Sequence, residues 1–323
     1  MMVYILFVIG FFLLIKGADY LVDGSSAIAK EFQIPELVIG LTIVSFGTSM
    51  PELIVNLLAS FNGNSELAVG NVFGSNIANV LLILGVSALI KPLPIQRSIY
   101  FTEIPISLAA TFMVGFLANA NLFLDVPGLS LSQADGGILL FFFGLFMTYI
   151  YAVSKSKSGL MDIADSDAHL ENLPRSKSVL YIIGGVLALF LGGKWVVDGA
   201  VQIASFMGLS ETFIGLTVVA IGTSLPELVT SAVAAKKGQA DIAVGNVIGS
   251  NIFNILWILG LSALIRPLPF AVLSNMDILV VVFSSTLLIM AVVFSKEPKV
   301  NHWHGGIFLL CYLIYLVYLV NRG

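Results

Sequence analysis

Long apolar runs alternate with short polar segments along almost the whole chain. Most runs approach the roughly 20 residues that a helix needs to cross the hydrocarbon core of a bilayer. The alternation of apolar and polar residues typical of a membrane β-barrel is absent from the sequence. The pattern therefore predicts an all-α integral membrane protein with ten transmembrane helices. Their expected ranges are 2–21, 35–60, 66–90, 98–118 and 136–153 in the first half, and 178–200, 210–235, 241–265, 271–294 and 304–320 in the second.

Two polar motifs inside these runs occur twice, at a constant spacing of 175 residues. The segment GTSMPE at 47–52 returns as GTSLPE at 222–227, and GNVFGSNIAN at 70–79 returns as GNVIGSNIFN at 245–254. A charged side chain at the centre of a membrane helix costs about 2.5–3.5 kcal/mol on insertion scales. A single buried glutamate after a proline could simply start a helix, but two at equivalent positions indicate a duplicated ion site.

The similarity of the two halves extends without a gap from Gly17 to Pro94 in the first copy. Five helices per copy is an odd number, so two copies joined by a linker that stays on one side of the membrane must have opposite orientations. We therefore expect two inverted five-helix repeats, at 1–154 and 178–323, joined by the polar linker 155–177.

The distribution of lysine and arginine in the expected loops gives the orientation, because cytoplasmic loops carry an excess of these residues. Loops on one side hold only Arg266 and Arg322, and the other side has many more basic residues. We therefore expect the linker in the cytoplasm and both termini outside. The basic residues of the expected cytoplasmic side are Lys30, Lys91, Arg97, Lys155, Lys157, Arg175, Lys177, Lys236, Lys237, Lys296 and Lys299.

Composition agrees with a membrane protein: 58% of the residues are hydrophobic, 11% are charged and the mean hydropathy is +1.01. A soluble domain would carry about 25% charged residues. The net charge of −4 gives no indication of nucleic-acid binding, and the single Cys311 excludes a disulfide framework or a cysteine metal site. The sequence has neither a Gly-x-Ser nucleophile with a membrane histidine nor a buried aspartate pair, so we do not expect an enzyme.

The repeated motifs contain the chemistry of a site for hard cations. Pro51 and Pro226 cannot donate a backbone hydrogen bond, and each ring clashes with the carbonyl four residues earlier, so the second and seventh helices should break there. Freed carbonyls, hydroxyls and carboxylates are ligands for hard cations such as Ca²⁺, and Na⁺ accepts similar donors. We expect the third and eighth helices to be broken as well and to complete the site. The candidate residues are Thr48, Ser49, Glu52, Ser75, Asn79, Thr223, Ser224, Glu227, Ser250 and Asn254.

The expected charge of this site suggests a mechanism. Two glutamates and two neutral asparagines give about −2, which one Ca²⁺ or two Na⁺ would neutralise. Holding both kinds of ion at once would leave excess positive charge in a low-dielectric site. Competition for the same oxygens therefore favours an antiporter in which Ca²⁺ and Na⁺ take turns.

At these motifs the chain resembles the sodium/calcium exchangers of the calcium:cation antiporter superfamily, in their compact prokaryotic form. The close match covers 40–94 and 215–269. The resemblance implies that Glu52 and Glu227 bind Ca²⁺ with the backbone of Thr48 and Thr223. It also implies that Ser49, Ser75, Ser224 and Ser250 line flanking Na⁺ sites near Asn79 and Asn254. It further implies alternating access, with the first and sixth helices sliding across a fixed core.

Several alternatives stay open at this point. Buried glutamates can also carry protons, so a Ca²⁺/H⁺ exchanger of the same fold is possible. A K⁺-dependent Na⁺/Ca²⁺ exchanger of the same fold is a further alternative. Potassium-dependent relatives, and some sodium-only prokaryotic ones, carry Asp where this chain has Asn254, so this residue argues only mildly against K⁺ coupling. A cation channel is disfavoured, because a self-contained inverted repeat around one site is typical of a carrier that functions as a monomer. We expect the lipid bilayer and the ions Ca²⁺ and Na⁺ as partners, no cofactor, and a location in the cell (inner) membrane.

Overall fold

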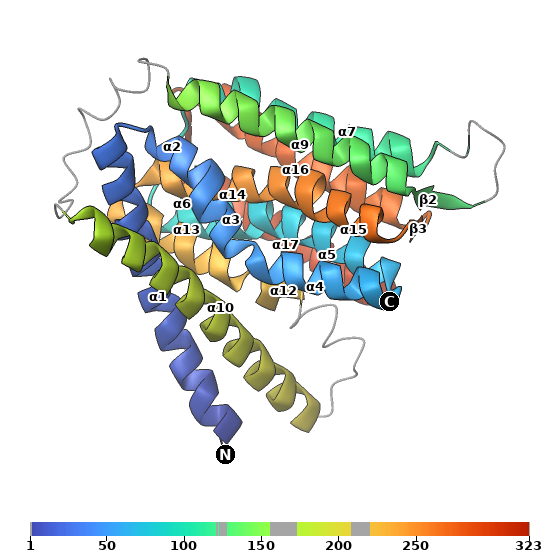
Figure 1. The fold of residues 1–323 in the computed structure, drawn as a ribbon, viewed down its shortest axis with the longest axis horizontal. Coiled ribbons are helices and arrows are strands. Elements are labelled where there is room, and N and C mark those ends of the chain that lie inside the picture. Colours follow the sequence, from blue (N-terminus) through green and yellow to red (C-terminus); the bar gives the residue numbers. More distant parts are fainter. Residues whose placement is uncertain (1, 121, 123–127, 156–172, 208–219, 323) are drawn as a thin grey trace.

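The computed structural model describes residues 2–120, 122, 128–155, 173–207 and 220–322. Nearly all of this part is helical (Figure 1). Helix α1 spans Met2–Phe32, α7 spans Ile104–Ala118 and α9 spans Gln133–Ser154. The second expected helix comprises α2 (Glu36–Ile39), the π-helical turn η1 (Gly40–Val44), α3 (Ser45–Thr48) and α4 (Met50–Asn62). The third comprises α5 (Ser65–Ala78), the π turn η2 (Asn79–Ile83) and α6 (Leu84–Ile90), and the π turn η3 (Ile99–Glu103) precedes α7.

The second half repeats this series of elements. Helix α10 spans Arg175–Phe206, α12 spans Ala220–Thr223, α13 spans Leu225–Lys237, α16 spans Ser274–Val293 and α17 spans His302–Arg322. Between α13 and α16 lie α14 (Ala240–Ile252), the π turn η7 (Phe253–Ile258) and α15 (Leu259–Ile265). Within the described ranges, eight helices and one bent pair are long and apolar enough to span a membrane. The helical membrane fold is thus confirmed. The count of ten stays a prediction, because the expected seventh helix begins in 208–219, outside those ranges.

Several of the expected helix boundaries are wrong by three residues or more, and two of them lie in polar segments. Helix α1 continues eleven residues beyond the expected end at Leu21, because its polar second half is neutralised by a partner: Lys237 Nζ lies 2.7 Å from Asp23 Oδ1 and 3.2 Å from Asp19 Oδ1. Helix α10 begins at Arg175, so the last residues of the expected linker are helical. The remainder of the linker, 156–172, lies outside the described residues.

The expected break before Pro51 is confirmed. The helix axis bends by 50° between 36–48 and 50–62. Ser49 lies at the junction with φ −82° and ψ 9°, and α4 starts with Pro51 in its first turn. Ser224 has almost the same backbone angles, φ −86° and ψ 6°, before Pro226 in α13. The same local sequence therefore produces the same interruption in both halves.

The third and eighth helices are not broken, contrary to expectation. Each continues without interruption, over Ser65–Ile90 and Ala240–Ile265. A π turn, η2 or η7, lies in the middle of each. The physical reason is that neither helix contains a proline, so no carbonyl loses its donor and the turn merely widens by one residue.

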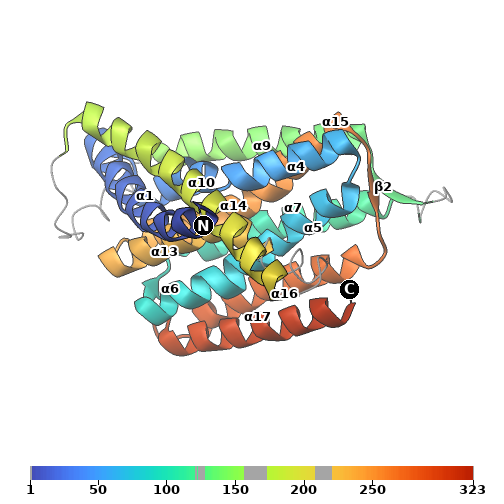
Figure 2. The ribbon, with the colours of Figure 1, turned by 90° about the horizontal axis from the view of Figure 1, so that it is seen from below.

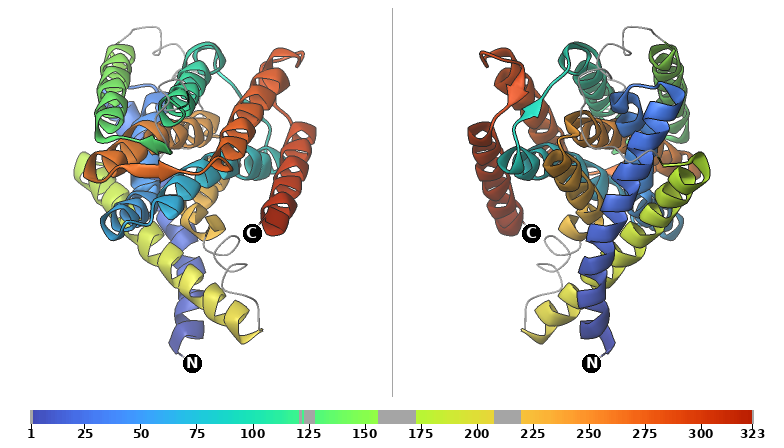
Figure 3. Two further views of the ribbon diagram at one scale, coloured as in Figure 1. Left: turned by 90° about the vertical axis from the view of Figure 1, so that its right-hand side faces the viewer. Right: turned by 90° about the vertical axis from the view of Figure 1, so that its left-hand side faces the viewer.

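Glycines allow α1 and α10 to cross in direct backbone contact. A Cβ atom added to Gly17 would lie 2.9 Å from the carbonyl oxygen of Gly185, and one added to Gly10 would lie 2.9 Å from that of Gly192. The spacing of 175 residues maps Gly10 onto Gly185 and Gly17 onto Gly192. The crossing thus relates the two halves by an approximate two-fold axis. Figures 1 and 3 show this pair of helices leaving the remaining bundle together.

Two short antiparallel ribbons also join the halves. The strand β1 (Leu93–Pro94) pairs with β4 (Lys299–Val300), and β2 (Leu129–Leu131) pairs with β3 (Leu268–Phe270). Each ribbon thus combines the strand that follows the third or eighth helix with the strand before the last helix of the other half. The adjoining helices pack in the same crossed manner, α17 on α6 and α9 on α15. Figure 2 shows α17 running beside α6 and α16.

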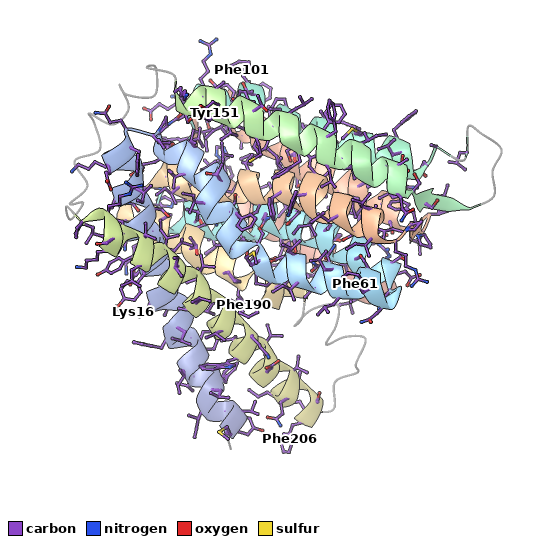
Figure 4. The ribbon with its side chains drawn as sticks, viewed as in Figure 1. Lys16, Phe61, Phe101, Tyr151, Phe190 and Phe206 are labelled. Carbon is purple, nitrogen blue, oxygen red and sulfur yellow. The ribbon has the colours of Figure 1, made fainter. Side chains whose placement is uncertain are left out.

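Large apolar side chains cover the outside of the bundle. Phe61, Phe101 and Phe206 project from three different helices in Figure 4, and each is more than half exposed. In water such a surface would be unfavourable, whereas the hydrocarbon of a bilayer solvates it.

The α1–α10 crossing yields a first testable prediction. A methyl group at Gly185 would lie 2.7 Å from both the oxygen of Gly17 and the nitrogen of Leu21, whereas one at the adjacent Gly184 meets no atom within 4 Å. We expect Gly185→Ala to destabilise the protein by about 1–3 kcal/mol through overpacking. Gly184→Ala is the matched control and should be neutral or slightly stabilising. Thermal unfolding in detergent measures the difference, and equal melting temperatures for the two variants would contradict the close crossing.

Candidate functional site

The two helix interruptions place one glutamate from each half at the start of a helix. Glu52 lies in the first turn of α4 and Glu227 in the first turn of α13, and each is 1% exposed. The amino end of a helix carries a partial positive charge that favours a carboxylate. The repeated sequence therefore supplies a local reason for tolerating each acid in an apolar protein.

Serines at the interruptions connect each half to the glutamate of the other. Ser49 Oγ donates to Glu227 Oε1 at 2.8 Å, and Ser224 Oγ donates to Glu52 Oε1 at 3.4 Å. The same hydroxyls lie 2.9 Å from Ser250 Oγ and 3.3 Å from Ser75 Oγ, respectively. All these contacts cross between the repeats. The two acids and four serines thus form one buried cluster.

The asparagines of the cluster lie where the α-helical part of the third and eighth helices gives way to a π turn. Asn79 is the first residue of η2, and Asn254 is the second residue of η7. Asn79 Nδ2 donates to Asn251 Oδ1 at 2.9 Å, and Asn254 Nδ2 donates to Asn76 Oδ1 at 3.0 Å. Both amide nitrogens are therefore occupied by a residue of the opposite half.

The threonines before the interruptions also bond across the repeats. Thr48 Oγ1 donates to Asn246 Oδ1 at 3.0 Å, and Thr223 Oγ1 lies 3.5 Å from Asn71 Oδ1. Asn246 is fixed in turn, because its Nδ2 donates to Ser231 Oγ at 3.0 Å. These threonine hydroxyls thus contact side chains of the GN motif in the opposite half.

Four oxygens of the cluster have no hydrogen-bond partner among the described residues, although all are buried: Glu52 Oε2, Glu227 Oε2, Asn79 Oδ1 and Asn254 Oδ1. They form two pairs related by the spacing of 175 residues. Among the described residues, no lysine, arginine or histidine forms an ion pair with either glutamate. A buried carboxylate without a cation is strongly unfavourable, so this arrangement favours neutralisation by a bound cation or a proton.

The ligand types in the cluster indicate which cations it could hold. All four unpartnered atoms are oxygens, the donors that Ca²⁺ and other hard cations prefer, whereas Zn²⁺ and copper favour nitrogen or sulfur. Among the described residues, no group of three or more His, Cys, Asp and Glu side chains could hold a metal ion. The cluster therefore suits an ion that is bound by carboxylate, amide, hydroxyl and carbonyl oxygens together.

All ten residues singled out from the sequence are buried, and the structure brings them into this one region. Sequence reasoning missed the asparagines that orient them, although these residues stand in the repeated motif itself. These asparagines are duplicated just as the candidate ligands are. Duplication alone, however, does not distinguish a residue that would bind an ion from one that orients such a residue. The ten buried residues are Thr48, Ser49, Glu52, Ser75, Asn79, Thr223, Ser224, Glu227, Ser250 and Asn254. The orienting residues are Asn71, Asn76, Asn246 and Asn251.

Comparison with known proteins gives a consistent result. The family model described as sodium/calcium exchanger protein matches residues 2–152 and 177–321. The inner membrane protein YrbG of Escherichia coli (strain K12) is 39% identical over 81% of this chain and 79% of its own length. The sodium/calcium exchanger MaX1 of Methanosarcina acetivorans is 34% identical, with 98% of each chain covered.

A solved structure agrees over nearly the whole chain. The sodium-calcium exchanger NCX_Mj, soaked with 2.5 mM Na⁺ and 0.1 mM Ca²⁺, superimposes with a TM-score of 0.82 at 32% sequence identity, covering 98% of each chain. Family match, sequence identity and fold therefore agree with the duplicated oxygen cluster: this chain belongs to the sodium/calcium exchanger family and is an integral membrane antiporter that exchanges Na⁺ for Ca²⁺.

Proposed function

We propose that the buried cluster between the two repeats is the transport site, and that one Ca²⁺ or Na⁺ ions occupy it in turn. The observation that carries this proposal is the set of four buried, unpartnered oxygens, two carboxylate and two amide, without a cation from the described part of the chain. An ion bound there would satisfy all four. The proposed ligands are Thr48, Ser49, Glu52, Ser75, Asn79, Thr223, Ser224, Glu227, Ser250 and Asn254.

Exchange follows from the charge of this site. With two carboxylates, the site is neutral when it holds one Ca²⁺ or two Na⁺, and binding both kinds of ion together is electrostatically unfavourable. An empty site leaves two carboxylates uncompensated in a medium of low dielectric constant, which opposes a change of orientation without cargo. The protein therefore alternates its access between the two membrane faces mainly when loaded, as a monomer whose two halves build a single site.

The orientation proposed for this carrier places it in the cell (inner) membrane with both termini outside and the linker 155–177 in the cytoplasm. The excess of lysine and arginine on the linker side supports this orientation. Lys91 adjoins β1 and Lys299 lies in β4, so both are at the ribbon of the proposed cytoplasmic side, whereas Arg266 precedes β3 at the opposite ribbon.

Reconstitution of the purified protein tests the driving ion. We expect radioactive Ca²⁺ to accumulate in liposomes that are loaded with Na⁺ and diluted into Na⁺-free medium, because outward Na⁺ movement releases the site for Ca²⁺. Loading with K⁺, or imposing a pH gradient without Na⁺, should give only background uptake. Uptake driven by protons alone would instead identify a Ca²⁺/H⁺ exchanger.

The glutamate pair provides a second test. Glu52→Gln removes one of the two charges that neutralise Ca²⁺, so we expect Na⁺-driven Ca²⁺ uptake to fall by at least 100-fold. The matched control is Glu66→Gln, the same change at an exposed residue in the first turn of α5, which should retain the wild-type rate. Uptake by the Glu52→Gln variant within a factor of a few of wild type would rule out this site.

The orientation has its own test in a chain whose only cysteine is replaced, Cys311→Ser. Ala134→Cys lies at the exposed start of α9 on the proposed outer side, and Glu297→Cys lies in the exposed loop before β4 on the proposed cytoplasmic side. A membrane-impermeant maleimide added to intact cells should label the first variant and spare the second. Inverted vesicles should give the opposite pattern, and the reverse result in both preparations would invert the proposed topology.

A further inference from the structure

Two asparagines just outside the proposed transport site form a crossed network between the repeats. Asn76 and Asn251 occupy the same place in the two copies of the GSN motif, and both are almost fully buried. Asn76 Nδ2 donates to the backbone carbonyl of Asn251 at 3.1 Å. A carbonyl can only accept a hydrogen bond, so this contact fixes which end of the Asn76 amide is nitrogen and which is oxygen.

This orientation is passed on to Asn254. Asn76 Oδ1, the end opposite the anchored nitrogen, accepts from Asn254 Nδ2 at 3.0 Å. The nitrogen of Asn254 is therefore directed to Asn76, and Asn254 Oδ1 is left without a partner among the described residues.

The other copy shows the same contact between the two amide groups. Asn251 Oδ1 accepts from Asn79 Nδ2 at 2.9 Å, and Asn79 Oδ1 is again a buried oxygen without a partner among the described residues. The spacing of 175 residues maps Asn76 onto Asn251 and Asn79 onto Asn254, so each orienting asparagine acts on a residue of the opposite half.

The orientation of these amides matters because the two ends of an amide group have nearly the same shape and opposite polarity. An asparagine turned by 180° would present NH₂, a donor with no lone pair for a cation, in place of a ligand oxygen. Residues that hold a metal ligand in its productive orientation typically change metal affinity by about 10–100-fold when they are removed.

We propose that Asn76 and Asn251 are positioning residues for ion binding: they hold the amides of Asn254 and Asn79 so that only oxygen faces the ion. This inference rests on the proposed transport site, because it assigns Asn79 and Asn254 as ligands. The two asparagines do not touch the ion themselves. They act by preventing the amide groups of Asn254 and Asn79 from turning by 180°.

The test measures Ca²⁺ binding directly, by isothermal titration calorimetry of the detergent-solubilised protein in Na⁺-free buffer. We expect Asn251→Ala to raise the dissociation constant at least 10-fold, because the amide of Asn79 is then free to turn. A dissociation constant within a factor of two of wild type would overturn the proposal.

A second background separates orientation from simple packing. In Asn79→Asp both terminal atoms are oxygens, so there is no orientation left to hold. We expect Asn251→Ala to cause no further loss of affinity in this background. A loss as large as in the wild-type background would show that Asn251 acts through packing and would overturn the proposal.

The matched control is another pair of mutually bonded amides, remote from the site. Asn119 on the carboxyl side of α7 and Asn275 in α16 exchange two hydrogen bonds, at 2.8 and 3.0 Å. Asn275→Ala should lower the melting temperature without changing the Ca²⁺ dissociation constant. A 10-fold weaker affinity in this variant would attribute the effect to any lost amide pair and contradict a specific role of Asn251.

Binding is measured without transport, so the two proposals fail in different ways. Wild-type protein that binds Ca²⁺ but shows no Na⁺-driven uptake would overturn the proposed exchange, while the loss of affinity in Asn251→Ala would still support the positioning role. Normal Na⁺-driven uptake by the wild type, combined with unchanged Ca²⁺ affinity in Asn251→Ala, would support the proposed exchange and overturn the positioning role.

Discussion

Two carboxylates lie in the apolar interior of this protein without a cation from the described chain, and most features of the site compensate for this charge. Each acid begins a helix, whose amino end favours negative charge, and each accepts a hydrogen bond from a serine of the opposite half. Neither contact neutralises the charge. In the proposed mechanism, the remaining negative charge makes the site selective for positive ions and opposes its movement when empty.

Duplication in opposite orientation allows one short motif to provide two different walls of the site. Ser49 reaches Glu227, and Ser224 reaches Glu52, so neither half could complete the cluster alone. The glycine contacts of α1 with α10 and the crossed ribbons β1–β4 and β2–β3 follow the same rule. Reciprocal contacts of this kind are expected when related halves face each other across a two-fold axis, and they hold the site at their interface.

Local features of the site could be predicted from the sequence because their causes are local. Pro51 and Pro226 each remove a backbone donor and clash with the carbonyl four residues earlier, so the breaks and the position of the following glutamates were foreseen correctly. The continuity of the third and eighth helices was not foreseen, because polar residues alone do not break a helix that keeps all its backbone donors. Likewise, the first helix was expected to end at Leu21, whereas the ion pair of Asp23 with Lys237 lets α1 continue to Phe32.

By itself, the sequence determined that the chain spans a membrane, that its halves are related, and that acids and amides recur inside apolar helices. These conclusions depend on composition and spacing, which are properties of the chain. Only the tertiary structure decided which amide nitrogen meets which oxygen, because Asn76 and Asn254 are joined across repeats far apart in sequence. The direction of an amide depends on its neighbours in space, and those neighbours come from the packing of one half against the other.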